Sequence, residues 1–214
     1  MKSFSLALAV GAALFLFVLP ASAGTIGVTY SGKITQVDPG GAAQFAVGDT
    51  FTFDLQLDDT VSDTSPAAGL GIYYDAITKF TGSFSNGFHF TMDTASAGDD
   101  RLGVGNDAAD ALSLTTGTFL APQVDAKQLV YVSLSFYDPT GTMFNSDAIP
   151  TDLVSLLAYS TLSPMMMQFG AAGQFFSVQG EVLTASTPIP AALPLLASAL
   201  GGLGFLGWKR RRVA

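Results

Sequence analysis

The sequence contains no cysteine, a single histidine and a single tryptophan. Without cysteine the chain has no disulfide framework and no thiolate for metal binding or nucleophilic catalysis. A single histidine excludes a two-histidine metal site, and a Ser-His-Asp triad would have to use it. Because His89 alternates with Phe88 and Phe90, and no Gly-x-Ser-x-Gly motif is present, we interpret it as a surface residue and expect no catalytic residues.

Positive charge is scarce in the middle of the chain. Residues 24–186 contain Lys33, Lys79, Arg101 and Lys127 against 17 acidic residues, a formal charge of −13. This acidity disfavours nucleic acid and anionic lipid as partners. Sixteen of the 17 acids are aspartates, which suit turns better than helices, so the composition indicates β-structure with many loops.

The N-terminus has the three parts of a secretory signal peptide. Lys2 precedes an uncharged apolar stretch over residues 4–19, and Pro20 ends that stretch. Ala21 and Ala23 then place small residues at the two positions that a signal peptidase reads. An uncleaved anchor is the alternative, but it has no need of this site. We therefore predict a signal peptide over residues 1–23, with cleavage after Ala23.

The C-terminus is also apolar. Residues 191–208 carry no charge and end at Trp208, and a basic cluster follows at once: Lys209, Arg210, Arg211 and Arg212. As a helix this span would be about 27 Å long, close to the thickness of a bilayer core. An amphipathic core helix would need a polar face, which is absent. We predict a transmembrane helix over residues 191–208 with its basic tail at 209–212 in the cytoplasm.

Between the two ends, apolar residues alternate with polar ones in short runs separated by glycine, proline and aspartate. The alternation predicts strands over residues 26–34, 51–57, 80–84, 88–92, 112–114, 130–136 and 176–182, and it places Val130 on the same face as Val132 and Leu134. Residues 24–186 are therefore predicted to be one all-β domain, an antiparallel β-sandwich or jelly roll, with a single partly closed barrel as the alternative. Residues 152–159 are a candidate helix, although a strand fits them almost as well. Expected core residues are Phe53, Leu55, Phe90, Val132, Leu134 and Val178.

Two patterns in this domain suggest chemistry. Residues 103–108 match the letters of a dinucleotide-binding fingerprint, but no helix is evident after them, so we interpret them as a loop. Aspartates cluster at Asp58, Asp59 and Asp63, at Asp99 and Asp100, and at Asp107 and Asp110. We interpret these as solvated turn residues and expect no metal or other cofactor; calcium is the alternative, although no EF-hand spacing is present.

The tail resembles a known sorting signal. Thr187, Pro188, Ile189, Pro190 and Ala191 are followed by the apolar span and the basic cluster. This order resembles the PEP-CTERM signal of Gram-negative bacteria, in the variant whose motif reads Val-Pro-Leu-Pro-Ala; Thr187 and Ile189 depart from that motif. The resemblance covers residues 187–214. It implies processing by an exosortase, a membrane-embedded peptidase, and association with exopolysaccharide or biofilm.

These observations lead to one expectation and one alternative. The expected protein is a non-enzymatic surface or matrix protein, held first in the inner membrane with its body in the periplasm and then delivered to the cell surface or beyond. The alternative is a carbohydrate-binding module or a glycosidase that acts on the same polysaccharide. Tyr73, Tyr74, Tyr131 and Tyr137 are candidates for stacking on sugars, although each also fits ordinary strand packing.

Overall fold

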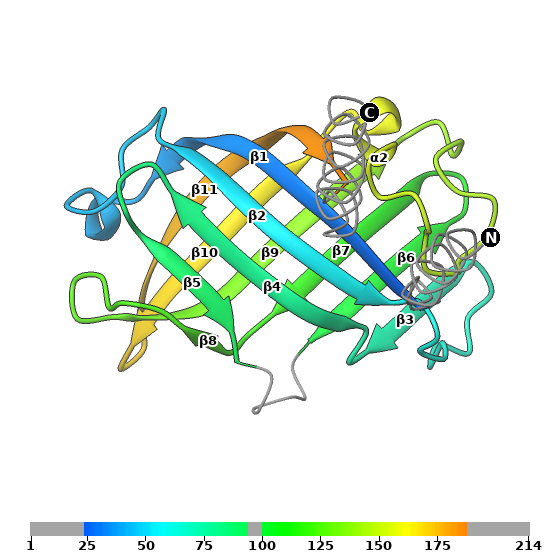
Figure 1. Ribbon diagram of the computed structural model, residues 1–214, viewed down its shortest axis with the longest axis horizontal. Coiled ribbons are helices and arrows are strands. Elements are labelled where there is room, and N and C mark those ends of the chain that lie inside the picture. The colour runs from blue at the N-terminus through cyan, green and yellow to red at the C-terminus, as the bar shows by residue number, and fades with distance from the viewer. Residues whose placement is uncertain (1–23, 94–99, 188–214) are drawn as a thin grey trace, which may run out of the picture.

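The computed structural model describes residues 24–93 and 100–187 and is almost entirely β-structure (Figure 1). Eleven strands are joined by turns, one 3-10 helix, η1 (Pro39–Gly41), and one short helix, α2 (Leu156–Tyr159). The strands are β1 (Thr25–Val37), β2 (Thr50–Asp58), β3 (Leu70–Tyr74), β4 (Ile77–Phe84), β5 (His89–Met92), β6 (Arg101–Asn106), β7 (Asp110–Thr116), β8 (Phe119–Leu120), β9 (Gln128–Asp138), β10 (Pro164–Ala171) and β11 (Gln174–Ser186). The all-β class predicted from the sequence is confirmed.

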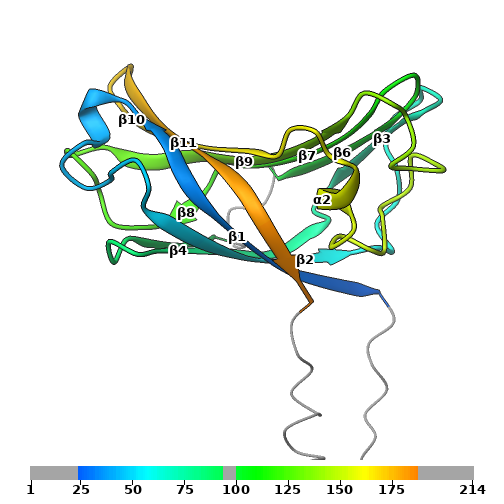
Figure 2. The same cartoon turned by 90° about the horizontal axis from the view of Figure 1, so that it is seen from above.

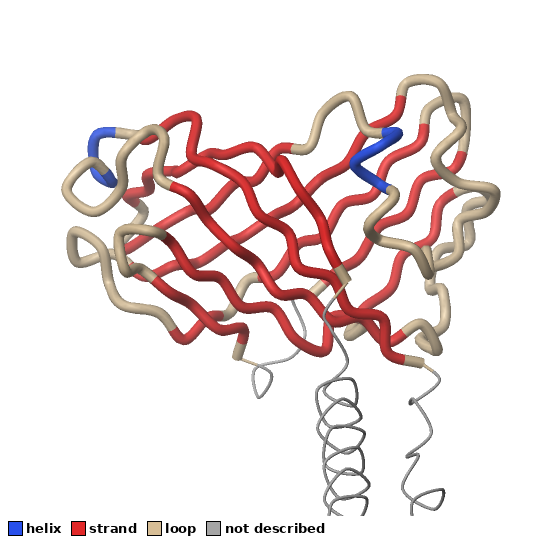
Figure 3. Tube along the Cα trace, turned by 45° about the horizontal axis from the view of Figure 1, so that its top comes forward, coloured by secondary structure: helices blue, strands red, loops and turns tan. Residues whose placement is uncertain are grey.

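All eleven strands belong to one sheet, in the order β3-β6-β7-β9-β10-β11-β1-β2-β4-β5-β8. Every strand pair is antiparallel. Figure 3 traces the sheet as one continuous network of neighbouring strands. The expected sandwich would divide the strands between two sheets, whereas here β11 and β1 join the two halves directly, so the arrangement is closer to the single-sheet alternative.

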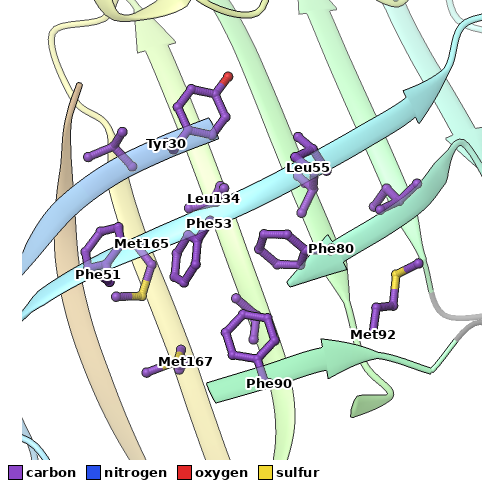
Figure 4. Close-up of a cluster of buried hydrophobic side chains, with 14 of the residues drawn as sticks. Tyr30, Phe51, Phe53, Leu55, Phe80, Phe90, Met92, Leu134, Met165 and Met167 are labelled. Carbon is purple, nitrogen blue, oxygen red and sulfur yellow. The ribbon is translucent and has the colours of Figure 1, made fainter. Parts of the chain in front are cut away.

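The sheet curls so that one half lies over the other, as Figure 2 shows. Phe88, beside β5, lies 5.6 Å from Phe169 of β10 between ring centroids, although β11, β1, β2 and β4 separate the two strands in the sheet. In Figure 4 the side chains of Phe53, Phe80 and Phe90 point toward those of Leu134 and Met167. The core is therefore the concave face of one sheet. At roughly 1.5–3 kcal/mol for each large side chain removed from water, this face is the main source of stability.

The six residues expected in the core are all buried, with exposed fractions of 2% or less. Alternation predicts their strands well because each strand presents one face to the core and one to solvent. In β9 the alternation is interrupted, since Gln168 pairs with Tyr131 and the next residue, Phe169, pairs with Leu129. Val130 is the extra residue of this bulge and is only half-buried, and Leu129 is buried in its place. The expectation that Val130 faces the core is wrong.

Some elements differ from those expected. Residues 103–106 form part of strand β6 and are not a loop; because the next element is β7, the helix that a dinucleotide site requires is missing there. Strands β3 and β10 also form where no strand was predicted. The candidate helix over residues 152–159 is reduced to α2. Of the described residues, none belongs to a helix that is long and apolar enough to cross a membrane.

The described chain begins and ends on neighbouring strands. Strand β11 lies between β10 and β1, and Ser186 near its end pairs with Thr29 of β1. Residue 24, at the start of β1, and residue 187, after β11, therefore leave the sheet on the same side, as Figure 2 shows. The predicted signal peptide, the rest of the sorting motif, the transmembrane span and the basic cluster lie outside the described residues.

Candidate functional site

A hollow lies beside the turn between β10 and β11. It has a volume of about 480 Å³. We call it the Phe175 cleft; its lining residues are Asp38, Pro39, Gly40, Lys127, Gln174, Phe175 and Phe176. Segments from three distant parts of the sequence meet here, so the cleft exists only in the folded sheet.

Phe175 is held in the cleft by a two-residue turn. Ala171 pairs with Gln174, and the two residues between them, Ala172 and Gly173, have φ angles of 50° and 79°. This is the geometry of a tight hairpin, in which both central residues take positive φ. The Phe175 side chain is 59% exposed. Its ring lies over Gly170, where any Cβ would come within 2.4 Å of a ring carbon, so a glycine is needed beneath the ring.

Asp38 supplies a carboxylate to the lining of the cleft. Its Oδ2 accepts hydrogen bonds from the backbone N–H and the hydroxyl of Ser177, both at 2.7 Å. These bonds hold the pKa of Asp38 below its usual range, so the group stays charged in mildly acidic solution. The carboxylate thus has a fixed position and a fixed charge.

Lys127 supplies the positive group. Its ammonium lies 2.9 Å from Asp125 Oδ2 and 5.7 Å from the centroid of the Phe176 ring. Asp125 and Ala126 both have positive φ, and Val124 and Lys127 exchange two backbone hydrogen bonds around them. A second tight turn therefore presents Lys127 to the cleft.

The Phe175 cleft combines an exposed aromatic face with a carboxylate, an amide and an ammonium group. Such a combination suits a sugar ring, whose C–H face packs on an aromatic ring while its hydroxyls form hydrogen bonds. Among the described residues that line the cleft, Asp38 is the acidic one.

A second hollow, of about 330 Å³, lies within the 143–156 segment that precedes α2. Two buried tyrosines fasten this segment to the sheet. Tyr30 donates its hydroxyl hydrogen to Leu153 O at 2.9 Å, and Tyr73 donates to Asp147 O at 2.8 Å. Burial, together with the charge of Asp152, raises the pKa of Tyr30 well above its usual value. These phenols are therefore structural donors.

Of the tyrosines proposed to stack on sugars, Tyr74 and Tyr137 are exposed and Tyr131 is half-buried. For Tyr73 the strand-packing alternative holds, because it is 5% exposed and its hydroxyl donates a hydrogen bond to Asp147 O. None of the four tyrosines is among the residues that line the Phe175 cleft. Phe175 itself was missed, although the Ala172-Gly173 turn beside an aromatic residue was a usable signal.

His89 is exposed, as expected, with its Nδ1 3.3 Å from Gly87 O. The aspartate clusters behave in two ways. Asp58 accepts hydrogen bonds from the Thr60 hydroxyl and backbone N–H, and Asp63 accepts them from the backbone N–H groups of Ile72 and Ser65. These bonds lower the pKa of each carboxyl and agree with the interpretation of both as turn residues. Asp110 is wholly buried, so that interpretation is wrong for this residue.

Thr187, the first residue of the sorting motif, is exposed and follows β11 after Ser186. The other motif residues Pro188, Ile189, Pro190 and Ala191, the basic cluster, and Ala21 and Ala23 lie outside the described residues. Within the described ranges, no group of three or more histidine, aspartate or glutamate side chains is placed to hold a metal ion.

Comparisons with known proteins do not extend this description. No protein-family model matches the sequence, and no curated protein and no solved structure is significantly similar to it.

Proposed function

We propose that this protein is an exported surface or extracellular-matrix protein that is sorted through its C-terminal tail and associates with exopolysaccharide. The observation that supports this most is the order of the tail: a Pro-x-Pro motif, an uncharged span of 18 residues and four cations. In this proposal, residues 1–23 direct export, the span first anchors the precursor in the inner membrane, and an exosortase-type peptidase then cuts near the motif.

The fold is compatible with such a tether. β11 runs to Ser186, so the motif begins directly after a strand that is paired on both sides. Alternating prolines keep the next residues out of a helix, and an extended segment is what a protease cleft accepts. Residues 24 and 187, at the two ends of the described domain, leave the sheet on the same side (Figure 2).

The test is fractionation of the native host with intact-mass analysis of the mature protein. Replacing Pro188 and Pro190 with alanine should leave an unprocessed precursor in the membrane fraction. Pro122→Ala, at an exposed loop position, is the matched control and should be processed normally. Replacing Lys209, Arg210, Arg211 and Arg212 with serine should weaken retention in the membrane. If the surface form still ends in Val213 and Ala214, the protein is a plain single-pass anchor.

A second candidate function is that of a carbohydrate-binding module, and the Phe175 cleft is the observation that favours it. Binding without hydrolysis would fit a matrix protein, because it attaches the domain to a polymer without degrading it. Incubation of the protein with the host polysaccharide distinguishes the two classes: retention on the polymer without release of reducing ends supports a binding module, whereas release of reducing ends supports a glycosidase.

A further inference from the structure

Two buried aspartates face each other at one end of the sheet. Asp110, the first residue of β7, pairs directly with Asp138, the last residue of β9. Asp110 is 0% exposed and Asp138 is 2% exposed. Both occupy core-facing positions of their strands, where directly opposite Cβ atoms are about 4.5–5.5 Å apart. The two carboxyl groups are therefore neighbours.

The ion pair between Lys127 and Asp125 lies in the turn before β9, and neither Asp110 nor Asp138 takes part in it. The Thr140 hydroxyl and backbone N–H donate hydrogen bonds to Asp138 Oδ1. Two carboxylates that face each other inside a sheet repel, and a cation bound between them would remove that repulsion.

Oxygen atoms from the loop after β9 converge on the same place. The Thr140 hydroxyl lies 2.6 Å from Asp138 Oδ1, and the Thr142 hydroxyl lies 3.0 Å from Oδ2 and 2.9 Å from the Thr140 hydroxyl. Residues 138, 140 and 142 thus supply side-chain oxygens at alternate positions of one loop. Thr140 and Thr142 are exposed, so an ion has a path from solvent.

The Asp110 side chain gives the evidence for a bound ion. Its Oδ2 accepts the backbone N–H of Phe144 at 2.8 Å, which ties β7 to the same loop. Its Oδ1 is buried and has no hydrogen-bond partner among the residues that the structure describes. Buried polar atoms without a protein partner are rare, and a bound ion or water is a common reason for one. Because Asp110 lies opposite Asp138 and bonds the end of the 138–144 loop, its unpartnered oxygen belongs to this oxygen cluster.

We propose that a calcium ion binds between Asp110 and Asp138, with the Thr140 and Thr142 hydroxyls as further ligands. Calcium takes six to eight oxygens in variable geometry, so carboxylates, hydroxyls and water together can satisfy it. Before the ion binds, the Thr140 and Thr142 hydroxyls donate their hydrogens to Asp138. When it binds, these hydrogens rotate away, which frees lone pairs on Asp138 and on both hydroxyl oxygens. Magnesium requires near-ideal octahedral geometry, so such a loop should bind it more weakly than calcium. This site is independent of the tail and of the Phe175 cleft.

The test is a thermal melt of the full chain in detergent, first stripped with EDTA and then titrated with calcium or magnesium. For the wild type, calcium at about 100 times its Kd should raise the Tm by about 5–10 °C, and magnesium should raise it less. Asp110→Asn should show no calcium shift. Asp107→Asn, a nearby exposed residue, is the matched control and should respond as the wild type does.

Three results would overturn the proposal: a wild type that shows no calcium shift, an Asp110→Asn variant that keeps the shift, or a control that loses it. If Asp110→Asn does not fold, Thr142→Val takes its place, since that exposed change removes one ligand and should weaken calcium binding at least tenfold by calorimetric titration. An unchanged affinity in Thr142→Val would also count against the site.

Discussion

Asp38 and Ser177, 139 positions apart in the sequence, are joined by two hydrogen bonds of 2.7 Å to one carboxylate oxygen. The bonds fasten the segment before η1 to β11 and fix one wall of the Phe175 cleft. They also lower the pKa of Asp38.

Ser177→Ala should destabilise the protein by about 1 kcal/mol at pH 7, because the carboxylate loses one charge-assisted bond. The folded pKa of Asp38 lies below its unfolded value, so the stability it contributes is present above about pH 4 and is lost as the pH falls further. The difference between wild type and variant should therefore shrink below pH 4. Urea melts at pH 7 and pH 3 measure it, and an equal difference at both values would contradict the assignment.

Loss of a ring from the aromatic core should destabilise the protein more than Ser177→Ala does. Phe53→Ala and Phe90→Ala should each cost about 3–5 kcal/mol, because both rings are fully buried among other rings and a cavity would remain. Phe175→Ala is the control for the same chemical change at an exposed position and should alter stability by about 0.5 kcal/mol at most. Denaturant melts of the three variants provide the comparison. A neutral result for Phe53 or Phe90 would place the core on the other face.

Two strand glycines should respond differently to a methyl group. A Cβ on Gly32, in β1 beside the bulge at Leu183 of β11, would come within 2.1 Å of Glu181 O, a backbone atom that has little freedom to shift. Gly32→Ala should cost about 1–3 kcal/mol. Gly103→Ala, in β6, meets nothing closer than 3.6 Å and should be neutral or stabilising by up to about 1 kcal/mol. Melting temperatures that fall equally for both would argue against the β1–β11 register.

The Phe175 cleft predicts a loss of polysaccharide binding that leaves the fold intact. Phe175→Ala should lower the affinity for the host exopolysaccharide by about fivefold to a hundredfold, because stacking energies on a single aromatic ring are about 1–3 kcal/mol. The affinity is measured from the retardation of the protein in gels that contain the polysaccharide. Tyr74→Ala, at an exposed aromatic on β3, is the control and should migrate as the wild type does. Equal retardation of all three proteins would remove the cleft from consideration.

Alternation along single strands predicted the β class and the core because it depends only on which residues face inward. The same signal was present in the missed strands: Met165, Met167 and Phe169 alternate in β10, and Leu102 and Val104 alternate in β6. Gly103 and Gly105 alternate with these residues and occupy the outer face of β6. Their spacing in the sequence matches a dinucleotide-binding fingerprint, although they belong to a strand.

Properties that depend on pairing were beyond the sequence. The bulge at Val130 depends on which residues of β10 lie opposite β9. Whether the strands form one curled sheet or the two sheets of a sandwich depends on whether β11 pairs with β1. The opposition of Asp110 and Asp138 likewise follows from the register of β7 with β9, since the two residues are far apart along the chain and each is preceded or followed by turn residues. Phe175 became a candidate only when Asp38 and Lys127 were found beside it.

The central position of β11 governs the order in which the molecule can assemble. A ribosome releases the chain from its N-terminus, so β1 and β10 emerge before the strand that must fill the space between them. Until β11 arrives, both neighbours present unpaired edges, which are templates for association with other chains. Contacts between the first and last strands also place this fold among the slowly folding topologies. The edge of β1 therefore stays unpaired until nearly the whole domain has emerged, whereas β10 meets its partner across a two-residue turn, and the last described strand is the one that joins the two halves.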